Sequence, residues 1–172
     1  MHIAFVTGPG RGDTDLLLAS VASRLEDAGL RACGTVQVNT ECEGDGPCDM
    51  DVQVLPDGPV IRISQTLGPE ARGCRLDPGA LETAIAACEA RLDGAEVLLV
   101  NKFGKQEALG RGFRGLIAEA LSRDMPVLVG LNALNKDAFC QFTDNVAVEV
   151  QPDRDAILSW LLRAVQNRQT VT

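Results

Sequence analysis

The sequence predicts an α/β fold in which a mainly parallel sheet has helices on both faces. Short apolar runs, typical of buried strands, alternate along the chain with segments whose apolar residues recur at helical spacing. Such alternation is typical of parallel strands joined by helices. The segment MDVQVLPDGPVIRIS, residues 50–64, differs, because its two strand-like runs flank a Pro-Asp-Gly-Pro turn. It predicts a hairpin, an antiparallel addition to the sheet.

The first part of the chain contains two predicted strands with a helix between them. The expected elements are a strand at 2–7, a helix at 15–28 and a strand at 31–38. Leu17, Val21 and Leu25 lie on one face of this helix, and Gly29 ends it. The polar loop NTECEGDGPCD then leads into the hairpin.

The rest of the chain continues the alternation. Asp77 is a good N-cap residue and Pro78 suits a first helical turn, so a helix is expected to begin there. Downstream we expect strands at 95–100, 126–131 and 145–150 and helices at 113–123, 136–142 and 153–167.

Length and charge limit the class of protein. A chain of 172 residues with 45% hydrophobic and 23% charged residues is typical of one globular domain, and no linker or internal repeat divides residues 1–172. A net charge of −8 argues against binding of nucleic acid or of anionic membranes. The start MHIAFVTGPG lacks the basic region of a secretory signal, and no apolar run is long enough to cross a bilayer. We therefore expect a cytoplasmic protein.

The stretch VTGPGRGDTD, residues 6–15, has the setting of a phosphate-binding loop, with an apolar strand before it and a helix after it. Such loops read G-x-x-x-x-G-K-[ST]: backbone N–H groups surround the phosphates, the lysine neutralises charge and the hydroxyl holds magnesium. Here the loop GPGRGDT is one residue shorter, and either Asp13 or Thr14 takes the lysine position. The candidate phosphate- or anion-binding residues of this loop are Gly8, Gly10, Arg11, Gly12, Asp13 and Thr14.

Three interpretations of this loop stay open. In the first it is only a tight turn, in which Asp13 is the N-cap of the following helix. In the second it is an anion site without its lysine, to which Arg11 lends charge, although a carboxylate beside a phosphate is repulsive. The third is hydrolysis by the ordinary phosphate-loop mechanism.

Polar segments follow three of the predicted parallel strands, namely the glycine loop, NKFGK and LNALNK. Ligands of such sheets bind beyond the carboxyl ends of the strands, so these segments are expected at one site. We therefore add Asn101, Lys102, Lys105 and Arg72 to the candidate anion site. Other basic residues of the loops are Arg62, Arg75, Arg111 and Arg114. The alternative is that all these cations are solvated and paired with Asp and Glu.

The segment DGAEVLLVNKFGKQEALGRGFRGLIAEAL resembles the nucleoside-triphosphatase family first described from thermophiles, in which Asp-Glu-x-Gly-Lys-Met-Glu follows the corresponding strand. Gly104, Lys105 and Glu107 match that stretch, and Phe113 matches a downstream phenylalanine. GPEARGCRLDPGALE is similar to the family's Gly-Pro-Arg segment. The resemblance implies a three-layer α/β/α fold of P-loop type. The chain departs from that family where its lysine, aspartate and glutamate are expected, because Asp13 (or Thr14), Asn101 and Lys102 stand there.

More closely, the chain resembles a bacterial family of uncharacterised proteins related to those triphosphatases. The segments that carry this resemblance are CDMDVQVLPDGPVIRISQ, LGPEARGCRLD and NKFGKQEALGRGF. Members tend to be encoded near molybdate-transport genes, which implies a part in molybdenum handling.

Three of the six cysteines, Cys42, Cys48 and Cys74, lie in glycine-rich loops, the first two near Asp49 and Asp51. Thiolates and carboxylates hold metals, but Cys-x5-Cys is not a usual zinc spacing and no histidine is near. These cysteines are therefore weak metal candidates, beside a redox pair or plain thiols.

The leading hypothesis is a nucleotide- or oxyanion-binding protein with a degenerate phosphate loop, acting as an accessory factor or sensor in molybdenum metabolism. Its ligand would be ATP or GTP with magnesium, or molybdate. The alternatives are a nucleoside triphosphatase with rearranged catalytic residues and an interaction module that binds no small molecule. Nothing in the sequence sets an oligomeric state.

Overall fold

The computed structural model describes residues 1–10, 12–39, 49–65 and 75–170. Within them, seven strands form one sheet in the order β4-β3-β2-β5-β6-β1-β7. The strands are β1 (Ile3–Val6), β2 (Ala32–Asn39), β3 (Met50–Leu55), β4 (Val60–Arg62), β5 (Val97–Phe103), β6 (Val127–Leu131) and β7 (Val148–Glu149). The α-helices are α1 (Asp13–Asp27), α2 (Pro78–Glu89), α3 (Lys105–Ala108), α4 (Arg114–Ser122), α5 (Lys136–Phe142) and α6 (Arg154–Thr170).

The sheet is parallel over five strands and antiparallel at one side. β2, β5, β6, β1 and β7 pair in parallel, whereas β3 pairs with β2, and β4 with β3, in antiparallel register. The expected hairpin at 50–64 is therefore confirmed as β3 and β4, and β3 attaches it to the sheet through β2.

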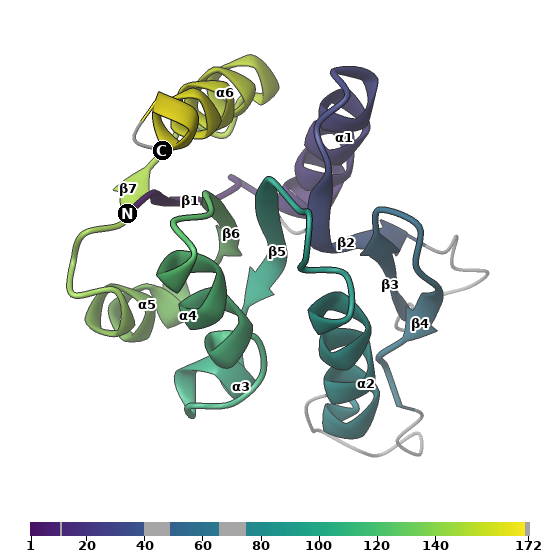
Figure 1. The fold of residues 1–172 in the computed structure, drawn as a ribbon. Coiled ribbons are helices and arrows are strands. Elements are labelled where there is room, and N and C mark those ends of the chain that lie inside the picture. Colours follow the sequence, from purple (N-terminus) through teal and green to yellow (C-terminus); the bar gives the residue numbers. More distant parts are fainter. Residues whose placement is uncertain (11, 40–48, 66–74, 171–172) are drawn as a thin grey trace.

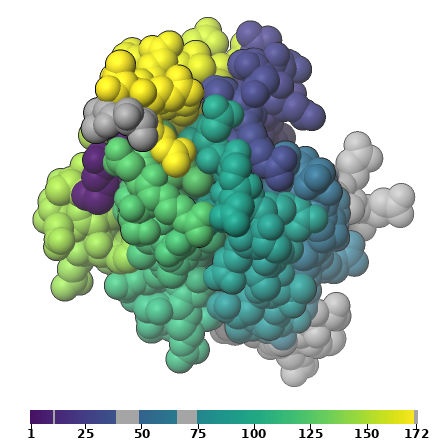
Figure 2. All heavy atoms as spheres, viewed as in Figure 1, coloured from purple at the N-terminus to yellow at the C-terminus, as the bar shows by residue number. Residues whose placement is uncertain are grey.

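Two helical layers cover the sheet. Figure 1 shows α1 and α6 on one side and α2 to α5 on the other. Side chains of one strand alternate between the two layers. Ala4 and Val6 of β1 pack with α1 and α6, while Ile3 and Phe5 pack into the core on the opposite face of the sheet. In Figure 2 the atoms of α1 and α6 lie together at the top of the molecule, where the two helices are in contact. The expected mainly parallel α/β/α architecture is confirmed.

Most predicted elements are present, with three differences. The strand expected at 95–100 continues to Phe103, because buried side chains recur beyond Val100. The strand expected at 145–150 is reduced to β7, since Asn145 has a φ of 58°, outside the β region. The short helix α3 and a 3-10 turn at Ala133–Asn135 were not expected.

Helix α2 begins as the sequence predicts. The Asp77 carboxylate caps it by accepting hydrogen bonds from the N–H groups of Gly79 (2.9 Å) and Ala80 (3.2 Å), and Pro78 is its first residue. Across the described part of the chain, no helix combines the length and apolar character that a membrane span requires.

Candidate functional site

The glycine loop connects β1 to α1 and leaves several backbone N–H groups open. Gly12, with a φ of 84°, makes the final turn into the helix, a conformation that favours glycine. The N–H of Gly8 donates to Thr14 Oγ1 at 3.0 Å, which closes the base of the loop. Among the described residues, no hydrogen bond is donated by the N–H groups of Gly10, Gly12, Asp13 or Thr14. Open N–H groups at a helix N-terminus are suited to an anion.

Asp13 is not the N-cap that the sequence predicts. The helix expected at 15–28 begins at Asp13, with Gly12 as its N-cap, and no side chain caps it. The exposed carboxylate turns back over the loop instead: a Cβ added to Gly10 would lie 2.6 Å from Asp13 Oδ2. The carboxylate therefore adds negative charge beside the open N–H groups.

Asn101, at the end of β5, is a buried link between three elements. Its side chain is 5% exposed. Its Nδ2 donates to Asp15 Oδ1 of α1 at 2.9 Å, and its Oδ1 accepts from the N–H of Gln37 in β2 at 3.0 Å. The amide thus holds the first turn of α1 against the sheet.

Lys102 and Lys105 are exposed on the segment that follows Asn101. Within the described residues, neither makes an ion pair or a side-chain hydrogen bond, so both ammonium groups are open to an external anion. β6 separates their strand from β1. Arg11 and Arg72, the two arginines predicted for the site, lie outside the described residues.

Of the other predicted cations, Arg111 is exposed, whereas the remaining three contact neighbouring side chains. Arg62 contacts Asp51 (3.0 Å) and Asp49 (3.2 Å), and these carboxylates raise the pKa of its guanidinium. Arg75 lies 3.7 Å from Asp49. For these two arginines the alternative interpretation, loop cations paired with acids, is correct. Arg114 stacks on the Phe142 ring, with its guanidinium carbon 4.5 Å from the ring centre.

Glu107 closes the loop that carries Lys105. Although charged, it is only 3% exposed, and its carboxylate accepts hydrogen bonds from the N–H groups of Gly104 (2.9 Å) and Phe113 (3.1 Å). The backbone of Gly112, at a φ of 60°, passes so close that a Cβ there would lie 2.2 Å from Glu107 Oε1. The sequence matched Glu107 to a family motif, but did not predict that its carboxylate would accept hydrogen bonds from the backbone of its own loop. The sequence did contain a signal for this contact, because Glu107 stands three residues after Gly104, which is the spacing at which a glutamate caps the start of a helix.

Asp15 was also missed by the sequence reasoning. It lies in the first turn of α1, where an acidic residue is ordinary, and its partner Asn101 is 86 positions away. No local pattern indicates such a contact.

No thiol site is formed in the described residues. They contain no group of three or more His, Cys, Asp or Glu side chains that could hold a metal. The candidates Cys42, Cys48 and Cys74 lie outside them. Cys33 and Cys88 are both free and fully buried, and the Cys33 thiol donates to the Cys88 carbonyl at 3.2 Å.

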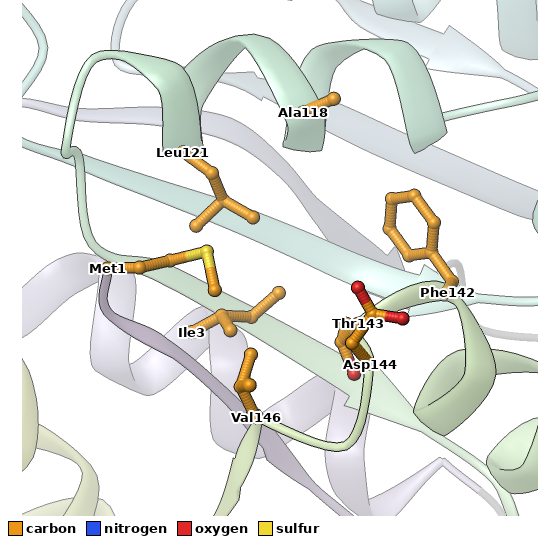
Figure 3. Close-up of a pocket in the computed structure, with 8 residues that line it drawn as sticks. All are labelled: Met1, Ile3, Ala118, Leu121, Phe142, Thr143, Asp144 and Val146. Atoms are coloured by element: carbon orange, nitrogen blue, oxygen red, sulfur yellow. The ribbon is translucent and has the colours of Figure 1, made fainter.

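An apolar pocket of about 170 Å³ lies away from the glycine loop. Figure 3 shows Met1, Leu121 and Val146 converging on it. Met1 precedes β1 and Leu121 lies near the end of α4, so the pocket is at the edge of the sheet opposite to the loop that follows β1. Its walls are mostly apolar and give a phosphate little to bind.

Comparison with known proteins assigns the chain to a family. Residues 3–160 match the sequence family described as a protein of unknown function, DUF2478. The chain belongs to the DUF2478 family. A relative with 36% identity over 162 residues is the molybdenum import ATP-binding protein ModC 2 of Bradyrhizobium diazoefficiens. The match covers 92% of this DUF2478 chain but 18% of that protein, so the chain spans about a fifth of its relative.

Among solved structures, the DUF2478 chain is similar to the solution structure of a human cancer-related nucleoside triphosphatase. The TM-score is 0.61 with 21% sequence identity, and both chains are covered over 100% of their length. The resemblance to the triphosphatases is thus confirmed for the fold alone.

Proposed function

We propose that this protein binds a nucleotide or an oxyanion at the glycine loop. The observation that carries the proposal is the set of open N–H groups at Gly10, Gly12, Asp13 and Thr14, in front of a helix of 15 residues. The helix dipole adds to their attraction for an anion. The fold shared with a nucleoside triphosphatase is consistent with a ligand in this position.

The residues at the loop favour binding over hydrolysis. Asp13 or Thr14 stands where a lysine is expected. The amide of Asn101 is hydrogen-bonded to Asp15 and to the N–H of Gln37 rather than to a metal-bound water. Lys102 and Lys105 supply charge from the neighbouring loop. A loop of this kind has a degenerate phosphate site, in which backbone N–H groups and remote cations replace the usual lysine.

The relative named as a molybdenum import ATP-binding protein suggests the setting. We propose an accessory factor or sensor in molybdenum metabolism, with ATP, GTP or molybdate as the ligand. A nucleoside triphosphatase with rearranged catalytic residues is the second candidate, favoured by the shared fold and by the segment around Gly104, Lys105 and Glu107.

A thermal-shift screen, followed by calorimetric titration, tests the proposal. The ligands are ATP and GTP with and without magnesium, phosphate, sulfate, molybdate and tungstate. A ligand at 100 times its dissociation constant stabilises the fold by about 2.7 kcal/mol, so the unfolding midpoint should rise by several degrees. Lys105→Ala should weaken binding, whereas Arg163→Ala, which removes an exposed cation from α6, should not.

Three outcomes separate the candidates. A shift with molybdate or tungstate alone indicates an oxyanion binder. A shift with nucleotide, together with magnesium-dependent phosphate release that Lys105→Ala abolishes, indicates the enzyme. If no ligand moves the midpoint, the loop is only a turn and the proposal is wrong.

A further inference from the structure

A cation from a third loop lies beside the start of the glycine loop. Lys136 begins α5, after β6 and the 3-10 turn at Ala133–Asn135. β6 pairs in parallel with β1, with Phe5 opposite Val129. Lys136 Nζ lies 5.4 Å from the centre of the Phe5 ring, and Phe5 is two residues before Thr7. The ammonium group is therefore at the carboxyl end of the strand that leads into the loop.

One carboxylate joins this lysine to the loop. Glu149 of β7 is the register partner of Phe5. Its Oε2 lies 3.2 Å from Lys136 Nζ, and its Oε1 accepts a hydrogen bond from Thr7 Oγ1 at 3.1 Å. Thr7 immediately precedes Gly8, so Glu149 holds Lys136 next to the first residue of the loop.

The contact between Lys136 and Glu149 is easy to exchange. The two side chains are 44% and 50% exposed, and exposed ion pairs contribute little to stability. Lysine carries its charge on a flexible four-carbon stem and can turn to another acceptor without moving the backbone. An anion of two or more charges in the loop would compete with the single charge of Glu149.

We propose that Lys136 supplies a positive charge in place of the lysine that the glycine loop lacks, and that Glu149 restrains Lys136 until a phosphate-like or molybdate-like anion displaces this carboxylate. This inference rests on the proposed function, because it needs an anion in the loop. It adds to that function a cation that binds the anion, Lys136, and a carboxylate that competes with the anion for this cation, Glu149.

Calorimetric titration of the full chain with molybdate, inorganic phosphate and magnesium ATP tests the proposal. Lys136→Ala should weaken binding roughly tenfold, the effect of losing one hydrogen bond between charged groups. Glu149→Gln keeps an acceptor for Thr7 but releases Lys136, and it should tighten binding severalfold. Arg163→Ala is the matched control for loss of one positive charge, and all variants should keep the wild-type unfolding midpoint.

The double variant Lys136→Ala/Glu149→Gln decides the mechanism. If Glu149 acts through Lys136, the double variant binds no more tightly than Lys136→Ala. If it retains the gain of Glu149→Gln, the gain is a general effect of removing negative charge, and the inference is wrong. If the wild type binds an anion and neither Lys136→Ala nor Glu149→Gln changes the affinity, this inference is wrong but the proposed function stands. No binding by wild type or Glu149→Gln overturns the proposed function, and this inference with it.

Discussion

Asn101 fits its position because both sides of its amide are used. The side chain needs one acceptor for its N–H and one donor for its carbonyl, and it finds Asp15 and the Gln37 N–H on different elements. An aspartate there would satisfy Gln37 but would face Asp15 as a second carboxylate at a site that is 5% exposed. An acidic residue at position 101 is thus incompatible with Asp15, and the two positions are coupled.

We expect Asn101→Asp to lower the free energy of unfolding by about 3 kcal/mol, because two carboxylates then meet without a donor between them. The exchanged pair Asp15→Asn/Asn101→Asp restores one donor facing one acceptor, so it should regain most of the loss. Urea denaturation of the two single variants and the double variant gives the coupling energy. A double variant no more stable than Asn101→Asp would show that the contact does not hold α1.

At the scale of elements, the segment from Gly104 to Phe113 is held by its own buried glutamate. The segment contains only one short helix, α3, and the carboxylate of Glu107 bonds the backbone at both of its ends. Lys105 and Arg111 lie on its exposed side. The two cations are therefore presented on a fixed backbone, which reduces the entropy lost when they bind an anion.

Replacing Glu107 by alanine should lower the free energy of unfolding by about 2 to 3 kcal/mol, since two buried N–H groups lose their acceptor. Hydrogen exchange at the amides of Gly104 and Phe113 should accelerate in the same variant. Glu82→Ala on the exposed face of α2 is the matched control and should change stability by less than about 0.5 kcal/mol. If hydrogen exchange at both amides stays at the wild-type rate, Glu107 does not hold the backbone of this segment.

At the scale of the whole molecule, two apolar cores lie on opposite faces of the sheet, and the core between the sheet and α2 to α5 holds two cysteines. Cys33 of β2 and Cys88 of α2 are completely buried. The hydrogen bond to Cys33 and burial raise the pKa of the Cys88 thiol, which keeps it protonated. Because the thiolate is the nucleophile, this thiol is inert while α2 stays packed.

Alkylation by iodoacetamide should therefore modify Cys88 only when the protein unfolds. Cys140, which is partly exposed on α5, should react in the native state. Mass spectrometry of the peptides, at increasing urea concentration, should place the labelling of Cys88 at the midpoint of global unfolding. Native-state labelling of Cys88 at the rate of Cys140 would mean that α2 opens independently of the rest of the molecule.

The sequence determined the features that depend on near neighbours. The alternation of strand and helix, the hairpin about Pro56–Pro59 and the cap at Asp77 rest on patterns within a few residues, and all three are found in the structure. It also placed the glycine loop between β1 and α1. The cap expected at Asp13 was wrong, because Gly12 makes the turn into the helix and Asp13 is already the first helical residue.

The tertiary structure decided what each site residue contacts. Asn101 and Asp15 are 86 positions apart, and Thr7 and Glu149 are 142 apart, yet each pair shares a hydrogen bond. Polar contacts of this kind leave no periodicity in the sequence, since either partner alone is an ordinary surface-type residue. They exist only because parallel strands bring their carboxyl ends, and the loops that follow them, to one edge of the sheet.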